Sequence, residues 1–475
     1  MKIARKLQLS YKDASFLTII FIISYSIVAI IVSLNRFWQY QDFYFDFGVF
    51  DMAIWKVSQF QLPFIDHIDL GIQNKIIFAD HFNPSIFLIS PLYWFTNRSE
   101  MLLIVQSLTV GLSAFVAYLI AIKKLRSKLL VFSLIFSYLG YVGLQNALIS
   151  DFHEATISVL PLILIFWSIY NQKWKIYFIL LIVLLGLKET FAGLGICLGI
   201  YLLIRYPKLK RYGLATILVS LVWGFLVIRY LIPYFSGGIY LYLIQQPLNL
   251  TFDSLYQSLF IPPIKMKTVF YSFASFGFLP ILDLAILPSI LENFFERFIL
   301  SSYKGQDLGL HYNATLSPLL FIGELYILSL LEKSKKLSKA LTIYGLSTIL
   351  LVLFLHKTLH GPLALAYNRV FYEQNKNVTY VDYFVSNFPK QGTIMTQNDL
   401  AVRLTHQSVK LLRYEYTKIN PDYVILNLTP GQNPNSFFPL NYDQTNDLKN
   451  RLLNDKNYKL KKFANDQYLF SKINL

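Results

Sequence analysis

The sequence has little charge and only one cysteine. Charged residues make up 15% and hydrophobic residues 55% of its 475 residues, whereas soluble proteins carry about 25% charged residues. The single cysteine, Cys197, lies in an apolar run, which excludes an intrachain disulfide and a metal site built from cysteines. A Walker-type phosphate loop, a glycine-rich dinucleotide motif and tandem repeats are also missing. The composition indicates a polytopic α-helical membrane protein.

Basic residues outnumber acidic ones. Lys and Arg total 43 and Asp and Glu total 27, which gives a net charge of +16. Such an excess occurs in proteins that bind nucleic acids and in proteins that contact anionic lipids. Here the basic residues gather in short loops between apolar runs. We therefore expect membrane lipid, and no nucleic acid, as the partner of this charge.

Long apolar runs recur along the chain as far as residue 357. A membrane-crossing helix needs about 20 apolar residues, fewer where neighbours shield it, and on this basis we expect about eleven spans. They are placed at 16–34, 100–122, 128–148, 155–171, 176–187, 190–204, 211–232, 268–283, 284–300, 313–331 and 340–357. The first run ends in NRFWQY without a small-residue cleavage site, so we expect an uncleaved span and a cytoplasmic N-terminus.

The apolar segment 81–95 is short and contains Pro84 and Pro91, so we expect a juxtamembrane or re-entrant element there. With that choice, four basic loops fall on the cytoplasmic side, as the positive-inside rule requires. These loops are 123–128, 171–175, 205–211 and 332–339. The first outer loop, 35–99, and the tail then lie outside, and we expect a multi-pass protein of the plasma membrane.

From residue 358 the chain becomes polar. Short β-like runs alternate with two helical patterns, 377–388 and 445–454. The β-like runs are 392–397, 408–414, 422–428, 458–463 and 467–472. We therefore expect a transmembrane domain over 1–357 and a small extracytoplasmic α/β domain over 358–475.

Ionisable residues gather near span ends that this topology places on the outer side. Such residues at span ends facing one compartment are typical of a polar cavity. The residues are Asp46, Asp51, Asp80, His81, Asp151, His153, Glu154, Lys188, Glu189, Asp307 and His311. The sequence thus predicts one polar site at the outer face.

The acidic residues allow two interpretations each. Asp46 precedes a helical pattern and would be either its N-cap or a catalytic base. Asp51 follows five positions later, roughly 140° around a helix, and would be either a second catalytic carboxylate or a solvated helix position. Asp151, His153 and Glu154 would hold a divalent cation, Mg²⁺ or Mn²⁺, or only favour the N-terminus of the following helix.

The basic residues also allow more than one interpretation each. Lys188 and Glu189 interrupt a long apolar stretch, which indicates two short helices meeting at the outer surface or a buried ion pair. The lysine could also hold a phosphate. His81 and His311 would bind substrate or only cap a helix and bridge loops. The aromatic loop 233–267 would close over a groove or lie flat on the membrane.

Five ordered blocks resemble a known family of membrane proteins, catalogued as domain of unknown function 2079 (DUF2079). The blocks are YFDFGVFDMAIW, ADHFNPSIFLISPLYW, SDFHEATISVLPLIL, LLGLKETFAGLG and GLHYNATLSPLLFI. The resemblance spans roughly residues 40–430. That family is similar to the C-type glycosyltransferase (GT-C) superfamily, whose multi-span enzymes use polyprenyl-phosphate sugars at the outer face.

This resemblance implies roles for the polar residues. Asp46 matches the superfamily's first-loop catalytic acid, and Asp151 and Glu154 match its second acidic motif, although here a histidine stands between them. The implied activity is transfer of a sugar from a polyprenyl-phosphate donor to an acceptor, with Asp46 as general base. Independently of the resemblance, the polar residues near the span ends lead us to expect Asp80, His81, Lys188, Glu189 and His311 as substrate-binding residues.

A lipid or glycolipid transporter or flippase is the competing prediction, and a non-catalytic glycan-binding membrane protein is a third. A transporter is expected to contain paired broken helices in its two halves. The sequence offers one such break, at Lys188 and Glu189, and its ionisable groups gather at one surface. These features favour catalysis at the outer face over transport.

Overall fold

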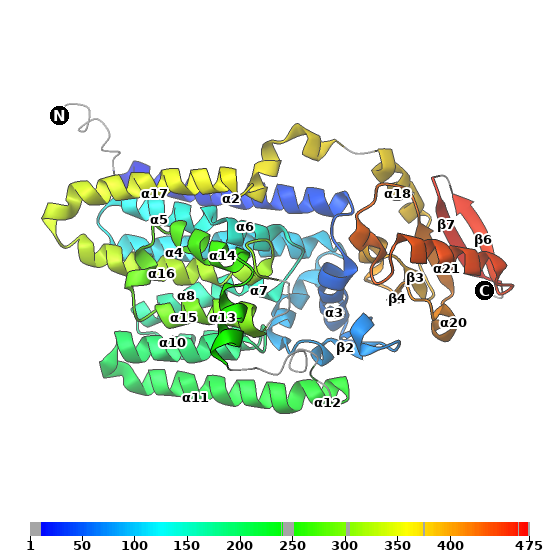
Figure 1. Ribbon diagram of the computed structural model, residues 1–475, viewed down its shortest axis with the longest axis horizontal. Helices are drawn as coiled ribbons and strands as arrows, with labels where there is room; N and C mark the ends of the chain where they lie inside the picture. Colours follow the sequence, from blue (N-terminus) through cyan, green and yellow to red (C-terminus); the bar gives the residue numbers. More distant parts are fainter. Residues whose placement is uncertain are drawn as a thin grey trace.

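The structure is a computed structural model that describes residues 11–238, 240, 251–300, 305–373, 376–463 and 465–473. Residues 239 and 241–250 of the aromatic loop lie outside the described residues, so its predicted closure over a groove stays a prediction. Long helices run side by side along the molecule, and a small sheet lies beyond one end of them (Figure 1). The chain is thus a helical body with a mixed α/β part at one end.

Five helical segments of the described chain are long and apolar enough to cross a membrane, and a bent pair would make six. The five are Ser15–Trp38 of α2 (Tyr11–Trp38), α4 (Glu100–Lys124), Pro207–Ser236 around α11 (Lys210–Leu226), His311–Leu331 around α16 (Leu316–Leu331), and Lys335–Thr358 around α17 (Ser338–Thr358). The bent pair is α5 (Lys128–Gly140) and α6 (Val142–Ile149), at 45°. The predicted count of about eleven spans is not confirmed.

The other predicted spans are shorter or broken. Helices α8 (Val159–Tyr170, preceded by α7, Glu154–Ile157), α9 (Trp174–Leu185) and α10 (Phe191–Arg205) are apolar but short. Segments 268–283 and 284–300 form α14 (Ile264–Ala274), η7 (Leu279–Leu282), α15 (Leu287–Phe295) and η8 (Glu296–Leu300). Gly277 and Phe278 adopt positive φ there, and Pro280 follows, so an uninterrupted helix cannot form.

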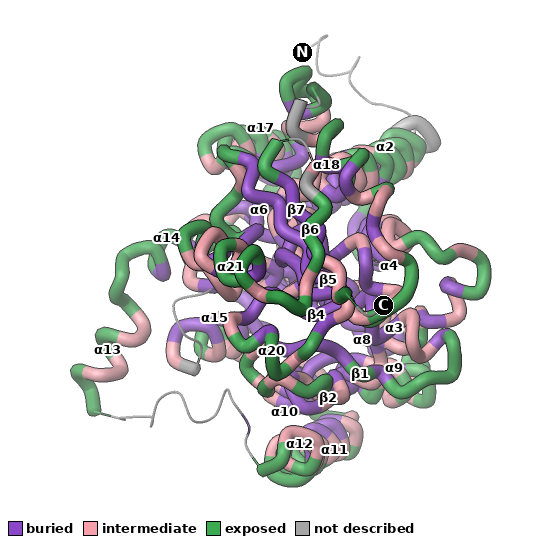
Figure 2. The backbone as a smooth tube through the Cα atoms, turned by 90° about the vertical axis from the view of Figure 1, so that its right-hand side faces the viewer, coloured by how far each residue is buried: buried purple, intermediate pink, exposed green. Residues whose placement is uncertain are grey.

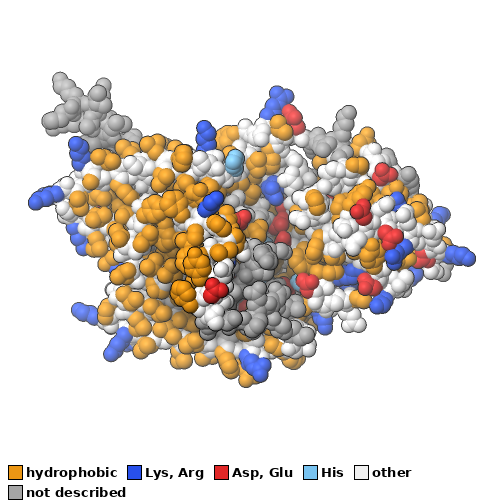
Figure 3. Space-filling view, viewed as in Figure 1, with side chains coloured by type: hydrophobic (Ala, Val, Ile, Leu, Met, Phe, Trp, Pro, Cys, Tyr) orange, Lys and Arg blue, Asp and Glu red, His pale blue; other side chains and the backbone are white. Residues whose placement is uncertain are grey.

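Basic loops meet at the end of the helices away from the sheet. The backbone amides of Arg126 and Ser127 donate to the Glu332 carboxylate at 2.7 and 2.6 Å, which ties two of these loops together. The connections α10–α11 and α16–α17 lie at the same end (Figure 1), where Lys and Arg side chains project (Figure 3). This clustering is the pattern that the positive-inside rule predicts for one side of a membrane.

The predicted first outer loop, residues 35–99, folds into short elements at the opposite end of the helices. They are η1 (Tyr44–Gly48), α3 (Val49–Ser58), β1 (Phe64–Ile65), η2 (Ile68–Leu70), β2 (Lys75–Ile76), η3 (Ile77–Ala79) and η4 (Pro84–Trp94). Strands β1 and β2 pair antiparallel. Segment 81–95 forms the 11-residue 3₁₀ helix η4 with Pro91 inside it, and it is not among the candidate spans. This agrees with the predicted juxtamembrane element.

The C-terminal part contains a five-stranded sheet in the order β4-β3-β5-β7-β6. The strands lie within the predicted β-like runs and are β3 (Ile394–Thr396), β4 (Val409–Leu411), β5 (Tyr423–Asn427), β6 (Tyr458–Phe463) and β7 (Gln467–Lys472). The helices are α18 (Lys376–Ser386), α19 (Asn398–Ala401), α20 (Tyr416–Ile419) and α21 (Tyr442–Asn454). β4, β3 and β5 are parallel, and β6 and β7 are antiparallel. Parallel strands buried on both faces are expected to be apolar throughout.

The two faces of this sheet have different partners. Ile394 and Ile425 belong to the same apolar core as the long helices. Met395 and Val424, whose side chains point the other way, form a second core with Leu448 of α21. Strands β3 and β5 are accordingly buried, whereas the edge strand β6 is largely exposed (Figure 2). The C-terminal part therefore packs directly on the first outer loop and the helix ends.

Candidate functional site

Most of the polar groups predicted to converge lie together, at the sheet end of the helices. Lys188 Nζ lies 3.4 Å from Glu154 Oε1. His81 Nδ1 lies 2.7 Å from Glu189 Oε1. The rings of His153 and His311 stack with centroids 3.5 Å apart. Segments that are far apart in sequence therefore form one polar cluster.

The break between α9 and α10 positions Lys188 and Glu189. Gly186 ends α9, and its carbonyl accepts a hydrogen bond from the Ser85 amide at 2.8 Å. A Cβ at Gly186 would collide with the Ser85 hydroxyl, so a larger residue would require the Ser85 side chain to move where the α9–α10 turn approaches η4. The two short helices predicted from the sequence are confirmed, and the turn between them carries charges that pair with other segments.

Glu189 is fully buried and is held by three groups. It receives hydrogen bonds from the Tyr240 hydroxyl at 2.8 Å and the Phe82 amide at 3.3 Å, in addition to its contact with His81. Burial disfavours the charged imidazole, but the Glu189 and Asp80 carboxylates outweigh it and raise the pKa of His81 to about 9. At neutral pH the His81 imidazolium therefore balances a buried carboxylate.

The turn between α6 and α7 is held by a glutamine from α4. Gln106 Nε2 donates to the carbonyls of Leu148 and Asp151 at 2.9 and 2.7 Å, and its Oε1 accepts from the His153 amide at 2.9 Å. Asp151 adopts a left-handed φ of 53°. Gln106 thus supports a backbone conformation that is unfavourable for a residue other than glycine.

Asp151 is directed toward another carboxyl group, that of Asp42. Both side chains are buried, and the two carboxyl groups lie close enough for each to affect the other's pKa. Burial, followed by the proximity of Asp42, raises the pKa of Asp151 well above its usual range. The charges of Arg36 and Arg403 favour the ionised form of Asp42. Asp42 lies four residues before Asp46, and this proximity in sequence could have identified Asp42 as a candidate site residue.

The predicted cation ligands Asp151, His153 and Glu154 do not surround one point. Asp151 lies near Asp42, whereas His153 Nδ1 lies 3.7 Å from Glu154 Oε2. Across the ranges that the structure describes, no group of three or more His, Cys, Asp or Glu is arranged to hold a metal ion. The Mg²⁺ or Mn²⁺ site stays a prediction, and this arrangement does not strengthen it.

Asp46 lies at the accessible edge of the cluster. Its side chain is 48% exposed, and its Oδ1 lies 3.9 Å from His153 Nε2. It sits inside η1, whose N-cap is Phe43, and α3 is preceded by Gly48, so the N-cap interpretation of Asp46 is wrong. A half-exposed carboxylate beside an imidazole is free to exchange a proton with a bound molecule.

Asp51 is placed differently, away from the polar cluster. It is fully buried, so the solvated interpretation is wrong. The hydroxyls of Tyr93, Ser99 and Thr405 donate to its carboxylate, and His406 Nε2 lies 3.3 Å away. Burial opposes its charge, but these partners keep the pKa of Asp51 below its usual value. Its contacts indicate a structural role where the C-terminal part meets the first outer loop.

Further residues that the sequence analysis did not select belong to the cluster. Tyr312 presents its ring 5.5 Å from Lys188 Nζ. His67 Nε2 lies 3.5 Å from Asp80 Oδ2. Both amide atoms of Asn83 are buried and have no hydrogen-bond partner among the described residues. Buried amides are normally paired, so Asn83 is suited to bind a polar ligand.

No curated protein matches the chain. The model of a family described as predicted membrane protein (DUF2079) matches residues 36–469, which is most of the chain and includes every residue of the cluster described above. The chain therefore belongs to the DUF2079 family of predicted membrane proteins.

Proposed function

We propose that the protein is an integral membrane glycosyltransferase that transfers a sugar from a polyprenyl-phosphate donor to a hydroxyl acceptor at the outer face. The observation that carries this proposal is the position of Asp46, half exposed at the edge of a cluster whose other charged side chains are largely buried. An accessible base beside buried cations suits a reaction that removes a proton and releases a phosphate.

In the proposed reaction, Asp46 accepts the proton of the acceptor hydroxyl. The acceptor oxygen forms a bond to the anomeric carbon as the bond from that carbon to the phosphate oxygen breaks, and the polyprenyl phosphate leaves with the bonding electrons. Lys188 has three N–H donors and contacts Glu154 and the Tyr312 ring, so it retains capacity to bind the phosphate. His81 adds a second positive charge, and Asp80, Glu189 and His311 would orient the sugar.

The test is turnover of labelled sugar by purified protein in detergent, with a panel of polyprenyl-phosphate donors. Asp46→Asn should lower turnover by about 10²–10⁴-fold, whereas the exposed Asp443→Asn on α21 serves as the matched control and should retain it. A chelator arm decides whether a divalent cation takes part. Normal turnover by folded Asp46→Asn would contradict the base assignment.

A lipid transporter or flippase is the second candidate, favoured by two interrupted helices. The pair α5 and α6 bends by 45° and leads into the 150–154 turn. Helices α9 and α10 are interrupted at Lys188 and Glu189. Such breaks form binding sites in transporters. Lipid movement across liposomes at a rate indifferent to Asp46→Asn, without donor turnover, would favour this candidate, and donor binding with neither activity would favour a glycan-binding protein.

A further inference from the structure

We propose that the apolar groove between α13 (Phe252–Phe260), α14 and α15 holds the hydrocarbon chain of the lipid donor, with its phosphate directed toward Lys188. This inference rests on the proposed function, because it locates the lipid part of the same substrate. The groove has a volume of about 500 Å³, within the range of pockets that bury a small ligand. Its lining consists of Leu259, Phe260, Met266, Val269, Leu291, Glu292, Phe294, Phe295 and Phe298.

The groove is built into the structure and is not a loose gap. Lys265 of α14 is almost fully buried, and its Nζ donates to the carbonyls of Ser258 in α13 and Phe298 in η8, at 2.5 and 3.2 Å. The Lys265 side chain thus links α14 to α13 and to η8, the segment that continues α15. A preformed apolar site binds a chain without the cost of ordering its walls.

The groove and the polar cluster share η8. Phe298 lines the groove, whereas the preceding residue, Arg297, is fully buried and donates to Asn313 Oδ1 at 2.8 Å, beside His311. Glu296 lies close enough to Lys188 for each to stabilise the other's charge. One turn of backbone therefore separates the apolar groove from the proposed phosphate site. This arrangement suits a lipid donor, which has an apolar chain joined to an anionic phosphate.

The groove lining is apolar apart from Glu292, which packs on Gly193 of α10. An apolar lining suits a hydrocarbon chain, whereas the cation Lys188 lies outside this lining and suits an anionic phosphate. The outer rim of α13 exposes Phe252, Tyr256 and Phe260 (Figure 3 shows apolar side chains across this face). A chain can therefore enter from the bilayer.

The test uses polyprenyl phosphate that carries a photoactivatable diazirine in its chain, with full-length protein in nanodiscs. Adducts are expected on α13 and α15. Leu291→Trp and Val269→Trp, which fill the groove, should lower labelling on the order of tenfold, equivalent to about 1.4 kcal/mol. The matched control, Leu350→Trp on the exposed face of α17, should not change it. Thermal unfolding of each variant verifies that it folds.

Competition and turnover complete the test. Excess unlabelled polyprenyl phosphate should abolish the adducts, and phosphatidylcholine should not. Labelling outside the groove, labelling unaffected by both tryptophan variants, or equal competition by phosphatidylcholine would overturn the inference. Groove adducts without sugar turnover would leave the chain site standing and refute the proposed function. Sugar turnover unaffected by filling the groove would refute the chain site alone.

Discussion

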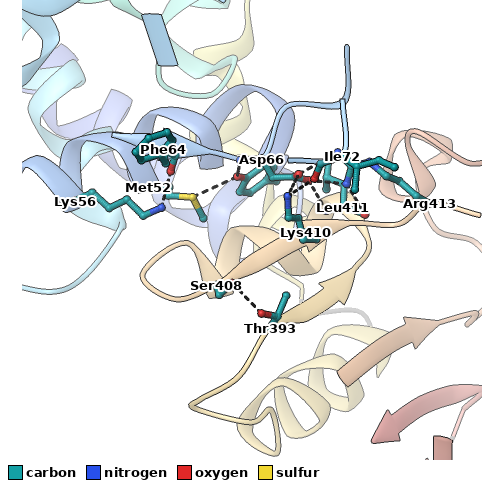
Figure 4. A network of polar contacts seen from close by, with 11 residues as sticks. Met52, Lys56, Phe64, Asp66, Ile72, Thr393, Ser408, Lys410, Leu411 and Arg413 are labelled. Carbon is teal, nitrogen blue, oxygen red and sulfur yellow. Dashed lines mark hydrogen bonds and ion pairs between the residues drawn. The ribbon is translucent and has the colours of Figure 1, made fainter. Parts of the chain in front are cut away.

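Arg413 binds Asp66 through both terminal guanidinium nitrogens, at 2.9 and 3.0 Å. Lys410 Nζ donates to the same carboxylate at 3.0 Å, and the Leu411 amide does so at 2.9 Å (Figure 4). Asp66 is fully buried and belongs to the first outer loop, whereas its partners end β4. The ends of parallel strands, where α/β sheets often bind ligands, are here occupied by the protein's own loop.

Removal of Asp66 should release the C-terminal part from this loop. Asp66→Ala leaves two buried cations without a counter-charge, and we expect a loss of about 3–5 kcal/mol in unfolding free energy. Thermal unfolding measures the loss of stability, and limited proteolysis between residues 373 and 394 measures the release of the C-terminal part. The control is Asp447→Ala, which breaks the exposed ion pair with Arg451 and should cost only about 0–1 kcal/mol. Equal losses in the two variants would show that the Asp66 contact does not hold the interface.

Asp51→Asn should lower the stability of the protein without lowering its donor turnover. The neutral amide accepts the hydroxyl hydrogen bonds of Tyr93, Ser99 and Thr405 less well, and we expect a loss of about 2–3 kcal/mol. Donor turnover per folded molecule should stay at the wild-type level, unlike that of Asp46→Asn. A large loss of turnover in fully folded Asp51→Asn would instead return Asp51 to the catalytic role that the sequence suggested.

The contact between Lys188 and Glu154 should behave as a coupled pair. Lys188→Met or Glu154→Gln alone leaves one buried group without its partner and should cost about 3–5 kcal/mol. The double variant should cost less than the sum, by about 0.5–3 kcal/mol of coupling. Chemical denaturation of the four proteins measures this cycle. Strict additivity would mean that the two charges do not interact.

Stability should fall in mildly alkaline solution because of His81. Its pKa is raised from 6.5 to about 9 in the folded protein, so its contribution is complete below about 6.5 and is lost as the pH rises through about 9. The groups that face it are Glu189, Asp80 and Lys188. Thermal unfolding across this window should show a steeper fall for wild type than for Glu189→Gln, which removes the main carboxylate. Parallel profiles would contradict the assignment.

The sequence was informative wherever a signal is local. Short β-like runs located the five strands of the C-terminal part, because the composition of such a run and the turn residues around it are local signals. The charged break at Lys188 and Glu189 located the turn between α9 and α10. Asp46 and His81 stood out because ionisable groups beside apolar runs are costly unless they have partners or a function.

Other features depend on contacts between distant segments, which no local pattern encodes. The predicted number of spans is not confirmed, because hydropathy does not distinguish a helix that faces lipid from a short helix buried among its neighbours, as α8 is, or from the broken segment 264–300. Asp46 and Asp51 look alike in the chain, yet one is half exposed and the other is sealed by Tyr93, Ser99 and Thr405.

Composition and periodicity were thus sufficient to indicate a helical membrane protein with a small α/β part and a set of polar residues at one end. Which of those residues face one another was decided by packing. The partners of Asp151, Glu154 and Glu189 come from segments up to about a hundred residues away. A carboxylate becomes a structural anchor or an accessible base according to the groups that tertiary folding brings within hydrogen-bond reach.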